Sequence, residues 1–335
     1  MRKSRIRKRV LVTGGAGYVG SHACKALARA GYAPVVYDNM SRGHAWAVKW
    51  GPLERGDLLN PARLAAVIKK HRTFAVLHFA ALAYVGESVE DPLRYYRNNV
   101  GGTMNLLEAM RDHGVDKLVF SSTCSIYGIP ERVPIPENHA QRPVNPYGHT
   151  KRVVEQMLFD SAAAHGLRSV CLRYFNAAGA DPEGEIGEAH DPETHLIPLV
   201  LEAAAGLRPR LVIHGTDYPT RDGTCIRDYV HVADLADAHV LALGYLARKS
   251  GASAFNLGNG NGFTVREVIA AAERLTGRKV ALRKGPRRPG DPPALVGNAA
   301  LARRKLGWKP RYRKLDAIIA TAWHWLENRG QSPIS

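Results

Sequence analysis

A tyrosine and a lysine four residues apart, Tyr147 and Lys151, are the pair in this sequence best suited to proton transfer. Asn145 and Pro146 precede them and suit the cap and first position of a helix, so both side chains are expected on one helix face. A phenol has a pKa near ~10, but a neighbouring ammonium and a cationic cofactor ring both favour its ionised form. The pair therefore predicts a tyrosine that accepts a proton from a substrate.

A cluster of hydroxyls precedes this helix. Ser121, Ser122 and Thr123 end the apolar run that begins at Lys117, which is a predicted strand. Ligands of open α/β sheets bind at the carboxyl ends of the strands, so these hydroxyls are expected near the tyrosine. Thr123 is the candidate to bridge a substrate hydroxyl and the phenol. Such clusters also cap turns. The prediction therefore depends on this cluster occurring together with the Tyr147–Lys151 pair and with the glycine-rich motif described next.

A glycine-rich turn, TGGAGYVG at residues 13–20, joins the first predicted strand to the first predicted helix. Gly14 permits the tight turn, Gly17 lets the backbone approach a pyrophosphate, and Gly20 allows close packing of helix on strand. The N-terminus of the helix then faces the phosphates. The turn therefore predicts a dinucleotide-binding site.

Asp38 ends the second predicted strand, 24 residues after Gly14. A carboxylate there accepts hydrogen bonds from the ribose hydroxyls of the adenosine and repels a 2′-phosphate, so the predicted cofactor is NAD and not NADP. Arg42 nearby weakens this choice slightly. Asp57, which follows the third strand, either lies near the adenine or caps the helix that begins around Pro61.

Short apolar runs alternate with helical patterns in the first half of the chain. The runs that we interpret as buried parallel strands are Arg9–Val12, Pro34–Tyr37, Phe74–Phe79, Lys117–Ser121 and Ser169–Tyr174. This alternation predicts an α/β fold with a doubly wound parallel (Rossmann) sheet.

Beyond residue 176 the chain is irregular and rich in Gly and Pro before helices return at Val232–Leu246 and Val265–Leu275. A smaller, mostly C-terminal α/β substrate lobe is therefore expected beside the NAD-binding lobe. The expected division is 9–176 for the NAD-binding lobe, with 232–250 returning to it, 177–231 and 251–330 for the substrate lobe, and 1–8 for a basic extension.

The formal net charge of the 335 residues is +17 at pH 7 and is concentrated at the two ends of the chain. Residues 1–10 contain six Lys or Arg and no acid, and residues 260–335 contain sixteen against five Asp or Glu. No nucleic-acid-binding motif accompanies these segments, and an anionic small substrate explains part of the charge. We therefore expect no nucleic-acid partner and interpret the extension as solvated.

The remaining composition indicates a globular cytoplasmic protein. Apolar residues make up 45% of the chain and charged residues 23%, which excludes disordered and fibrous classes. The longest apolar runs are far shorter than the ~20 residues that span a bilayer, and the basic N-terminus is not followed by the apolar segment of a signal peptide. The four cysteines are widely spaced, so neither disulfides nor a metal site is expected.

Eight segments, in order, resemble one family. They are VLVTGGAGYVGSH, HFAALAYVGESV, YYRNNVGGT, SSTCSIYG, NPYGHTK, LRYFNAAGADP, DGTCIRDYVHVADLADAH and RRPGDPP. On these segments the chain resembles the extended short-chain dehydrogenase/reductases, and within them the UDP-glucose 4-epimerases, from Val10 to about Trp325. The resemblance implies a Rossmann fold, tightly held NAD, a UDP-sugar substrate and a homodimer.

The resemblance also implies roles for individual residues. Tyr147 corresponds to the catalytic base, Thr123 to its Ser/Thr partner, and Lys151 to the lysine that holds the nicotinamide ribose. The positions that match cofactor contacts are Gly14, Gly17, Tyr18, Val19, Gly20, Asp38, Asn39, Asp57, Leu58, Phe79, Ala80, Ala81, Asn98, Ser121, Ser122, Tyr147, Lys151 and Phe175. The positions that match substrate contacts are Thr123, Tyr147, Asn176, His195, Leu196, Arg227, Leu295, Arg288 and Asp291. The guanidinium groups of Arg227 and Arg288 also suit pyrophosphate oxygens on physical grounds.

Two positions depart from the pattern of some relatives. Ala83 stands where those relatives have a lysine, so that contact is absent here or supplied elsewhere. Leu295 stands where some relatives have a tyrosine, which is understood to exclude N-acetylated sugars from the pocket. The leucine leaves acceptance of UDP-N-acetylhexosamines open.

The implied reaction inverts C4 of a UDP-hexose, interconverting UDP-glucose and UDP-galactose through a 4-keto sugar. A UDP-xylose/UDP-arabinose 4-epimerase and a UDP-N-acetylglucosamine 4-epimerase remain alternatives. A nucleotide-sugar 4,6-dehydratase is disfavoured, because it needs an added acid/base pair where this chain has Cys124 and Ser125. An NAD-binding protein without turnover is disfavoured by the joint presence of Tyr147, Lys151 and Thr123.

Overall fold

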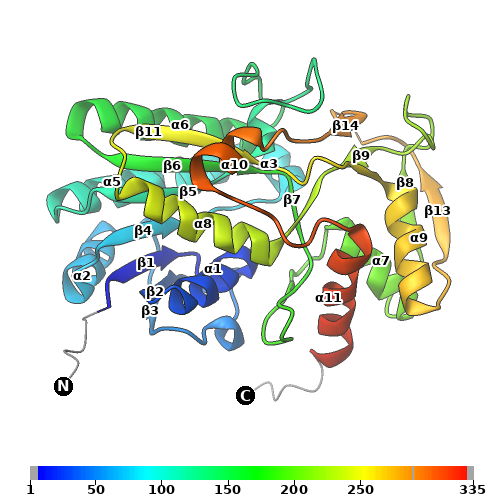
Figure 1. Cartoon of the computed structure of the whole chain (residues 1–335), viewed down its shortest axis with the longest axis horizontal. Helices are drawn as coiled ribbons and strands as arrows, with labels where there is room; N and C mark the ends of the chain where they lie inside the picture. Colours follow the sequence, from blue (N-terminus) through cyan, green and yellow to red (C-terminus); the bar gives the residue numbers. More distant parts are fainter. Residues whose placement is uncertain (1–6, 289, 330–335) are drawn as a thin grey trace.

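A seven-stranded parallel sheet forms the centre of the larger lobe in a computed structural model that describes residues 7–288 and 290–329 (Figure 1). In spatial order its strands are β11 (Ala252–Leu257), β6 (Arg168–Tyr174), β5 (Lys117–Thr123), β4 (Ala75–His78), β1 (Arg9–Thr13), β2 (Ala33–Asp38) and β3 (Leu53–Arg55). The strand order reverses between β1 and β4, which is where such sheets bind ligands at their carboxyl ends. The predicted doubly wound α/β fold is confirmed.

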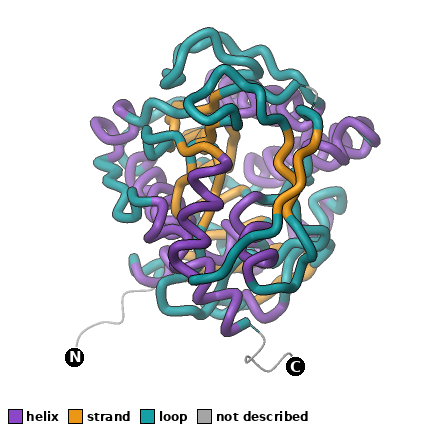
Figure 2. The backbone as a smooth tube through the Cα atoms, turned by 90° about the vertical axis from the view of Figure 1, so that its right-hand side faces the viewer, coloured by secondary structure: helices purple, strands orange, loops and turns teal. Residues whose placement is uncertain are grey.

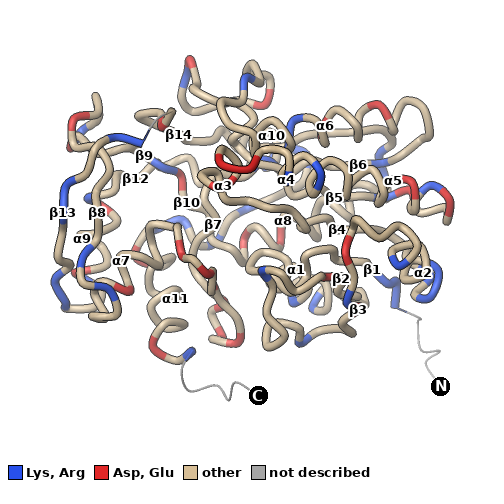
Figure 3. Tube along the Cα trace, turned by 180° about the vertical axis from the view of Figure 1, so that it is seen from behind, with Lys and Arg blue, Asp and Glu red and all other residues tan. Residues whose placement is uncertain are grey.

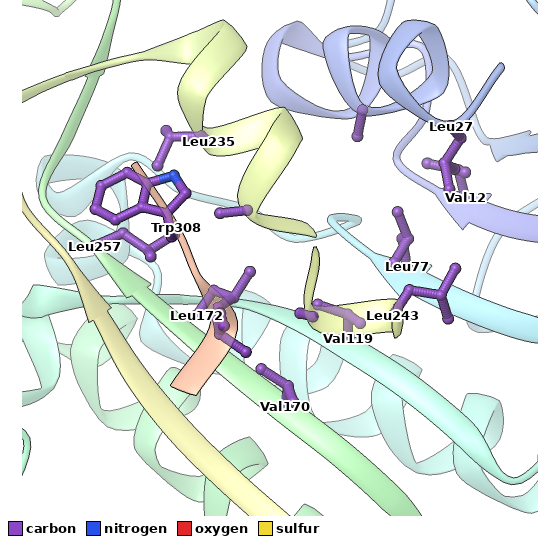
Figure 4. Packing of buried hydrophobic residues seen from close by; sticks show 14 of the residues in the cluster. Val12, Leu27, Leu77, Val119, Val170, Leu172, Leu235, Leu243, Leu257 and Trp308 are labelled. Carbon is purple, nitrogen blue, oxygen red and sulfur yellow. The ribbon is translucent and has the colours of Figure 1, made fainter. Parts of the chain in front are cut away.

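Helices cover both faces of this sheet. One face carries α1 (Tyr18–Arg29), α8 (Val232–Leu246) and α10 (Ala300–Leu306), and the other carries α2 (Pro61–His71), α5 (Gly102–Asp112) and α6 (Pro146–His165). Neighbouring residues of β1 point to opposite faces, so Val12 packs with the first group and Leu11 with the second. Figure 4 shows the first cluster, in which Leu243 of α8 lies with Val119 of β5.

Strand β11 departs from the expected division of the chain. It pairs with β6 from Ala252 opposite Ser169 to Leu257 opposite Tyr174, so it belongs to the central sheet. The sequence analysis places residues 251–330 in the substrate lobe, and this boundary is too early. The first half of β11 consists of Ala and Ser, which have weak strand propensity, so no strand was predicted there. With the boundary moved past Leu257, the two-lobe division remains our proposal.

The smaller end of the molecule has its own core. It contains α7 (Leu196–Ala204), α9 (Val265–Thr276) and α11 (Leu315–Asn328), with the strand pairs β8 (Leu211–His214) with β13 (Leu282–Gly285) and β7 (Asn176–Ala178) with β10 (Tyr229–His231). A three-stranded sheet joins β12 (Phe263–Thr264), β9 (Ile226–Arg227) and β14 (Ala294–Leu295). Figure 2 shows β8 and β13 side by side. Figure 3 shows Lys and Arg on β13, within the basic C-terminal region.

Short helices connect these elements. They are η1 (Ala45–Ala47), α3 (Val85–Glu90), α4 (Pro92–Tyr95), the π-helical η2 (Tyr96–Gly101) and η3 (Cys124–Ile126). None of the helices within the described residues combines the length and apolar character of a membrane span. All four cysteines are buried free thiols. Residues 1–6 of the expected basic extension and residues 289 and 330 of the expected substrate lobe lie outside the described residues.

Candidate active site

Helix α6 begins as predicted and carries the proton-transfer pair. The Oδ1 of Asn145 accepts a hydrogen bond from the Gly148 amide at 2.8 Å and caps the helix. Gly148 lies directly against the turn after β5, since a Cβ there would lie 2.6 Å from the Ser125 carbonyl oxygen. Only a residue without a side chain permits this approach, which places Tyr147 and Lys151 beside the end of β5.

The phenol of Tyr147 lies next to Thr123 and Tyr174. Burial raises the pKa of Tyr147 well above its ordinary value, the nearby Tyr174 raises it further, and a hydrogen bond with Thr123 offsets only part of this. The Nζ of Lys151 is 5.9 Å from the Tyr147 ring centroid and donates a hydrogen bond to the Ser121 carbonyl oxygen at 2.9 Å. The chain's own residues therefore raise the pKa of Tyr147 on balance, and a lower pKa in the presence of both the ammonium and the cationic cofactor ring stays a prediction.

Lys151 is buried beneath the same site. Burial lowers the pKa of Lys151 to about 7, and the carboxylate of Glu155, one helical turn later, partly offsets this effect. The Nζ also lies 4.7 Å from the centroid of the Phe120 ring. A lysine in this environment is held in one place and has an ammonium group available to a ribose hydroxyl.

Ser121 and Ser122 face opposite sides of β5. The Ser121 Oγ lies 2.6 Å from the Tyr174 hydroxyl, whereas the Ser122 Oγ donates to Glu155 Oε1 at 2.5 Å. Arg173 donates to the same carboxylate, with its Nη2 2.6 Å from Oε2. Ser121 therefore lies with the site residues, and the Ser122 side chain belongs to a buried ion pair instead. The sequence analysis missed Tyr174 and Glu155, although Glu155 continues the four-residue spacing of Tyr147 and Lys151.

The glycine turn has the geometry that a dinucleotide needs. Gly14 has a φ of +71°, and a Cβ there would lie 2.6 Å from the Ala80 amide nitrogen. A Cβ on Gly20 would lie 2.1 Å from the Gly14 carbonyl oxygen. Gly17 caps α1 without a side chain, which leaves the amides of the first turn accessible to phosphate oxygens.

Asp38 lies at the end of β2, as predicted. Its Oδ2 accepts a hydrogen bond from the Ala16 amide at 3.0 Å, and its Oδ1 accepts one from the Met40 amide at 2.8 Å. A Cβ on Gly43 would lie 3.1 Å from both carboxylate oxygens, so the absence of a side chain there leaves space above the carboxylate. This space and the remaining lone pairs fit the ribose hydroxyls of NAD.

Asp57 does not cap the following helix. Asn60 caps α2, with its Oδ1 accepting from the Arg63 amide at 3.0 Å. The Asp57 Oδ1 accepts from the Leu59 amide and its Oδ2 from the Asn39 side chain, each at 2.8 Å. The capping interpretation is wrong, and a position near the adenine, with Asn39 beside it, remains the prediction.

The other predicted cofactor contacts surround this edge of the sheet. Phe79, Ala80 and Ala81 follow β4, and Val19 is the second residue of α1. The Tyr18 hydroxyl donates to the Gly179 carbonyl oxygen at 2.6 Å, so this side chain links the glycine turn to the smaller lobe. Three candidates make contacts within the protein: Leu58 packs in the core below α5, Asn98 donates to Asn99 at 2.9 Å, and Phe175 packs near Cys124.

Three predicted substrate contacts meet where β9 pairs with β14. Arg227 lies opposite Leu295 in this pairing, and its guanidinium forms an ion pair with Asp291. The guanidinium also donates to the Pro292 carbonyl oxygen at 3.0 Å and is largely buried. Leu295 packs on the cluster formed by Cys124, Phe175 and their neighbours. Arg288 is exposed, and its carbonyl oxygen accepts a hydrogen bond from the Asp291 amide at 3.2 Å.

Two further candidates lie at element ends. Asn176 begins β7 and donates through Nδ2 to the Asp228 carbonyl oxygen at 3.1 Å. His195 precedes Leu196, the first residue of α7, but its ring is directed at Glu188, with Nδ1 2.5 Å from Oε1. The structure therefore places His195 in a side-chain cluster that the sequence analysis did not predict.

Comparisons with known proteins agree with this geometry. Residues 10–258 match the NAD dependent epimerase/dehydratase family. A UDP-glucose 4-epimerase from Rhizobium meliloti (strain 1021) is 55% identical over 96% of this chain and 98% of its own. The structure of UDP-glucose 4-epimerase from Brucella ovis in complex with NAD is 57% identical, with a TM-score of 0.92 over 95% of this chain and 98% of that one. A UDP-glucose-4-epimerase from Stenotrophomonas maltophila with bound NAD and formylated UDP-arabinopyranose is 42% identical, with a TM-score of 0.94 over 97% and 100%.

Proposed function

The chain belongs to the NAD dependent epimerase/dehydratase family, and from this premise we propose that it interconverts UDP-glucose and UDP-galactose by inverting C4 of the hexose. The observation that carries the proposal is the meeting of Tyr147 and Thr123 at the carboxyl end of β5. These are the groups needed to hold and deprotonate a sugar hydroxyl, and they lie on the same sheet edge as the glycine turn.

The cofactor is NAD, which the tight turn at Gly14 and the carboxylate of Asp38 hold by its pyrophosphate and ribose. When bound, NAD would supply the oxidation, its positively charged nicotinamide ring accepting a hydride from C4 and later returning it. Lys151 would donate to the ribose beside that ring, and its hydrogen bond to the Ser121 carbonyl oxygen fixes the position of the ammonium.

Tyr147 accepts the proton of the 4-hydroxyl while Thr123 holds the same oxygen. Because burial raises the pKa of Tyr147, its ionisation depends on positive charge nearby, and Lys151 is the chain's own contribution. The 4-keto sugar that results has lost the configuration at C4. Once the sugar presents its other face, return of the hydride to C4 on that face, with return of the proton from Tyr147 to the C4 oxygen, gives the epimer.

Arg227 anchors the UDP through its pyrophosphate. Asp291 and the Pro292 carbonyl oxygen hold the guanidinium in place, so its planar fork is oriented before substrate binds. Because the nucleotide is held firmly, the hexose can rotate about the pyrophosphate after the oxidation at C4 and present its other face for the reduction. Arg288, on the same turn, adds a second positive charge at the exposed edge.

The test uses the purified protein with UDP-galactose and no added NAD. We expect UDP-glucose to accumulate, and Tyr147→Phe to reduce the rate by about 10²–10⁴-fold. Conversion of UDP-xylose without conversion of either hexose would indicate the pentose reaction. Release of a 4-keto-6-deoxy sugar would indicate a dehydratase.

We also propose that a second copy of the chain covers the adjoining surfaces of η2, α5 and α6. Large apolar side chains are exposed there, including Tyr96, Met104 and Phe159. Such a patch is typical of an interface between subunits. Light scattering after size exclusion should give twice the mass of the chain, and Phe159→Glu should give the mass of one chain.

The proposed location is the cytoplasm. The support is that Cys24, Cys124, Cys171 and Cys225 are all unpaired buried thiols, as is usual in a reducing compartment. Fractionation of the source cells tests this proposal, and recovery outside the cytoplasm would contradict it.

A further inference from the structure

Two carboxylates and two imidazoles meet in the loop before α7. Glu188, His190, Glu193 and His195 each direct one ligand atom to a group in which all four atoms lie within 4.8 Å of one another. The Nδ1 atoms of His195 and His190 are 2.5 and 3.1 Å from Glu188 Oε1. Each Nδ1 is also 3.6 Å from one oxygen of Glu193.

These separations suit a small tetrahedral cation. Bonds of ~2.0–2.1 Å from zinc to nitrogen and oxygen put the ligand atoms about 3.4 Å apart. The separations of 3.1 and 3.6 Å lie close to this value, whereas the contact between His195 and Glu188 has to widen. With neutral imidazoles the two carboxylates carry two negative charges, which one divalent ion neutralises.

Burial and unsatisfied polar atoms point to the same interpretation. The carboxylates of Glu188 and Glu193 are 6% and 7% exposed, and buried charge is costly unless it is strongly compensated. The buried hydroxyl of Tyr84 has no hydrogen-bond partner among the described residues, and the Nδ1 of His190 has only its ion-pair contacts to Glu188 and Glu193. The two rings adjoin, with centroids 6.1 Å apart. A cation would use the ring nitrogen directly.

The loop is held in this conformation from outside the cluster. The Trp325 Nε1, on α11, donates to the Glu188 carbonyl oxygen at 3.0 Å. The ring Nε2 of His44, in the segment after β2, lies 2.6 Å from the Ala189 carbonyl oxygen. The four ligands are therefore positioned by distant parts of the chain, which lowers the cost of assembling a metal site.

We propose that Glu188, His190, Glu193 and His195 bind one divalent ion of the zinc class. Imidazole with carboxylate is a ligand set that suits zinc, and four protein ligands make the site closed and structural. The ion would fasten the loop between α11 and the segment after β2 and fix the start of α7. The competing interpretation is two ion pairs between histidines and glutamates without a metal. The expectation of no metal site was based on cysteine spacing and did not consider these residues.

The experiment measures zinc in the full-length protein. The chelator-treated protein is dialysed against zinc chloride, and its metal content and affinity are determined by mass spectrometry and by competition with a chromophoric chelator. We expect one zinc per chain. Removing a residue that only hydrogen-bonds to a metal ligand costs about 10–100-fold in metal affinity. Removing a ligand itself, in His190→Gln or Glu193→Gln, should therefore lower the zinc affinity at least ~100-fold.

Two further variants make the result interpretable. His113→Gln removes an exposed histidine at the end of α5 and should bind zinc like the original chain. His190→Cys replaces one zinc ligand by another and should recover most of the affinity. Absence of stoichiometric zinc from the original chain would overturn the proposal, as would equal affinities in His190→Gln and His113→Gln.

Thermal unfolding supplies a readout independent of turnover. An ion that binds only the folded state raises the Tm by mass action. Zinc should therefore raise the Tm of the original chain and of His113→Gln, and leave that of Glu193→Gln unchanged. An equal shift in all three proteins would show adventitious binding only and overturn the proposal. Circular dichroism without zinc establishes that each variant is folded.

Discussion

The ammonium of Lys151 and the carbonyl oxygen of Ser121 are joined by a hydrogen bond of 2.9 Å. This bond ties the first turns of α6 to the end of β5, so the helix that carries Tyr147 and the strand that carries Thr123 are held at a fixed separation. The ammonium is thereby directed to the sheet, and its distance of 5.9 Å from the Tyr147 ring follows. The lysine organises the site as well as bringing charge to it.

Replacing Asp38 by Asn should weaken the retention of NAD. A carboxylate forms charge-assisted hydrogen bonds with ribose hydroxyls, and each such bond is worth about 1.5–3 kcal/mol, so the affinity should fall by at least ~10-fold. The substitution also removes the charge that opposes a 2′-phosphate, so the preference for NAD over NADP should narrow. Titration of the nucleotide-free variant with both cofactors measures both effects. An unchanged ratio of the two affinities would contradict the assignment of Asp38.

Replacing Arg227 by Lys should raise KM for the UDP-sugar. The ammonium keeps the charge but loses the planar fork that Asp291 orients, and we expect an increase of about 10-fold, or roughly 1.4 kcal/mol, with a smaller change in kcat. Arg221→Lys is the matched control, because Arg221 forms a similar pair with Glu267 on the surface. Steady-state kinetics on both variants test this, and equal KM values would argue against a role for Arg227 in binding UDP.

Replacing Leu295 by Tyr should narrow the range of UDP-sugars that the protein accepts as substrates. Leu295 lies opposite Arg227 and packs near Cys124, so a larger ring there takes space from the site. We expect the ratio of kcat/KM for UDP-N-acetylglucosamine to that for UDP-glucose to fall by about 10-fold or more, since modest steric differences are worth ~1–3 kcal/mol. A panel of UDP-sugars measures this. A proportionate fall for both sugars would mean that Leu295 does not select between them.

Replacing Glu54 by Gln should make the protein less sensitive to acid. Lys70, His71 and Arg63 lower the pKa of Glu54 to about 2, against 4.5 in the unfolded chain. The unfolded state therefore binds more protons between these values, and the stabilisation from Glu54 is complete above pH 4.5 and lost as the pH falls toward 2.

The size of this effect is limited by the exposure of Lys70 and Arg63, so we expect about 1–2 kcal/mol at pH 6. Urea unfolding of both proteins at pH 6 and pH 3 measures it. The difference in free energy of unfolding should shrink at pH 3, and a difference that stays constant would exclude ionisation of Glu54 as its source.

Local signals made most of the fold predictable. The strand that ends at Asp38 and the capped start of α6 depend on residues adjacent in sequence, and both were found within a residue or two. Strand β11 was missed because its small residues resemble a loop, and only its pairing with β6 makes it a strand.

The proximity of the candidate site residues was predictable from the sequence, and the directions of their side chains were less so. Residue types placed Tyr147 and Lys151 together, but the direction of the ammonium depends on the Ser121 carbonyl oxygen, which no spacing reveals. The side chain of Ser122 likewise turns to Glu155 because of the pleat of β5. The cluster around Glu188 was missed because an irregular loop has no periodicity from which facing side chains can be inferred.

The return of α8 and β11 to the central sheet limits how the molecule can be engineered. Since the chain passes between its two halves more than once, neither half corresponds to one continuous stretch of gene. A cut or an insertion at a single connection leaves the halves linked by the others. Chimaeras that exchange sugar preference must therefore graft scattered short segments, such as the one containing Leu295, and cannot exchange a contiguous block.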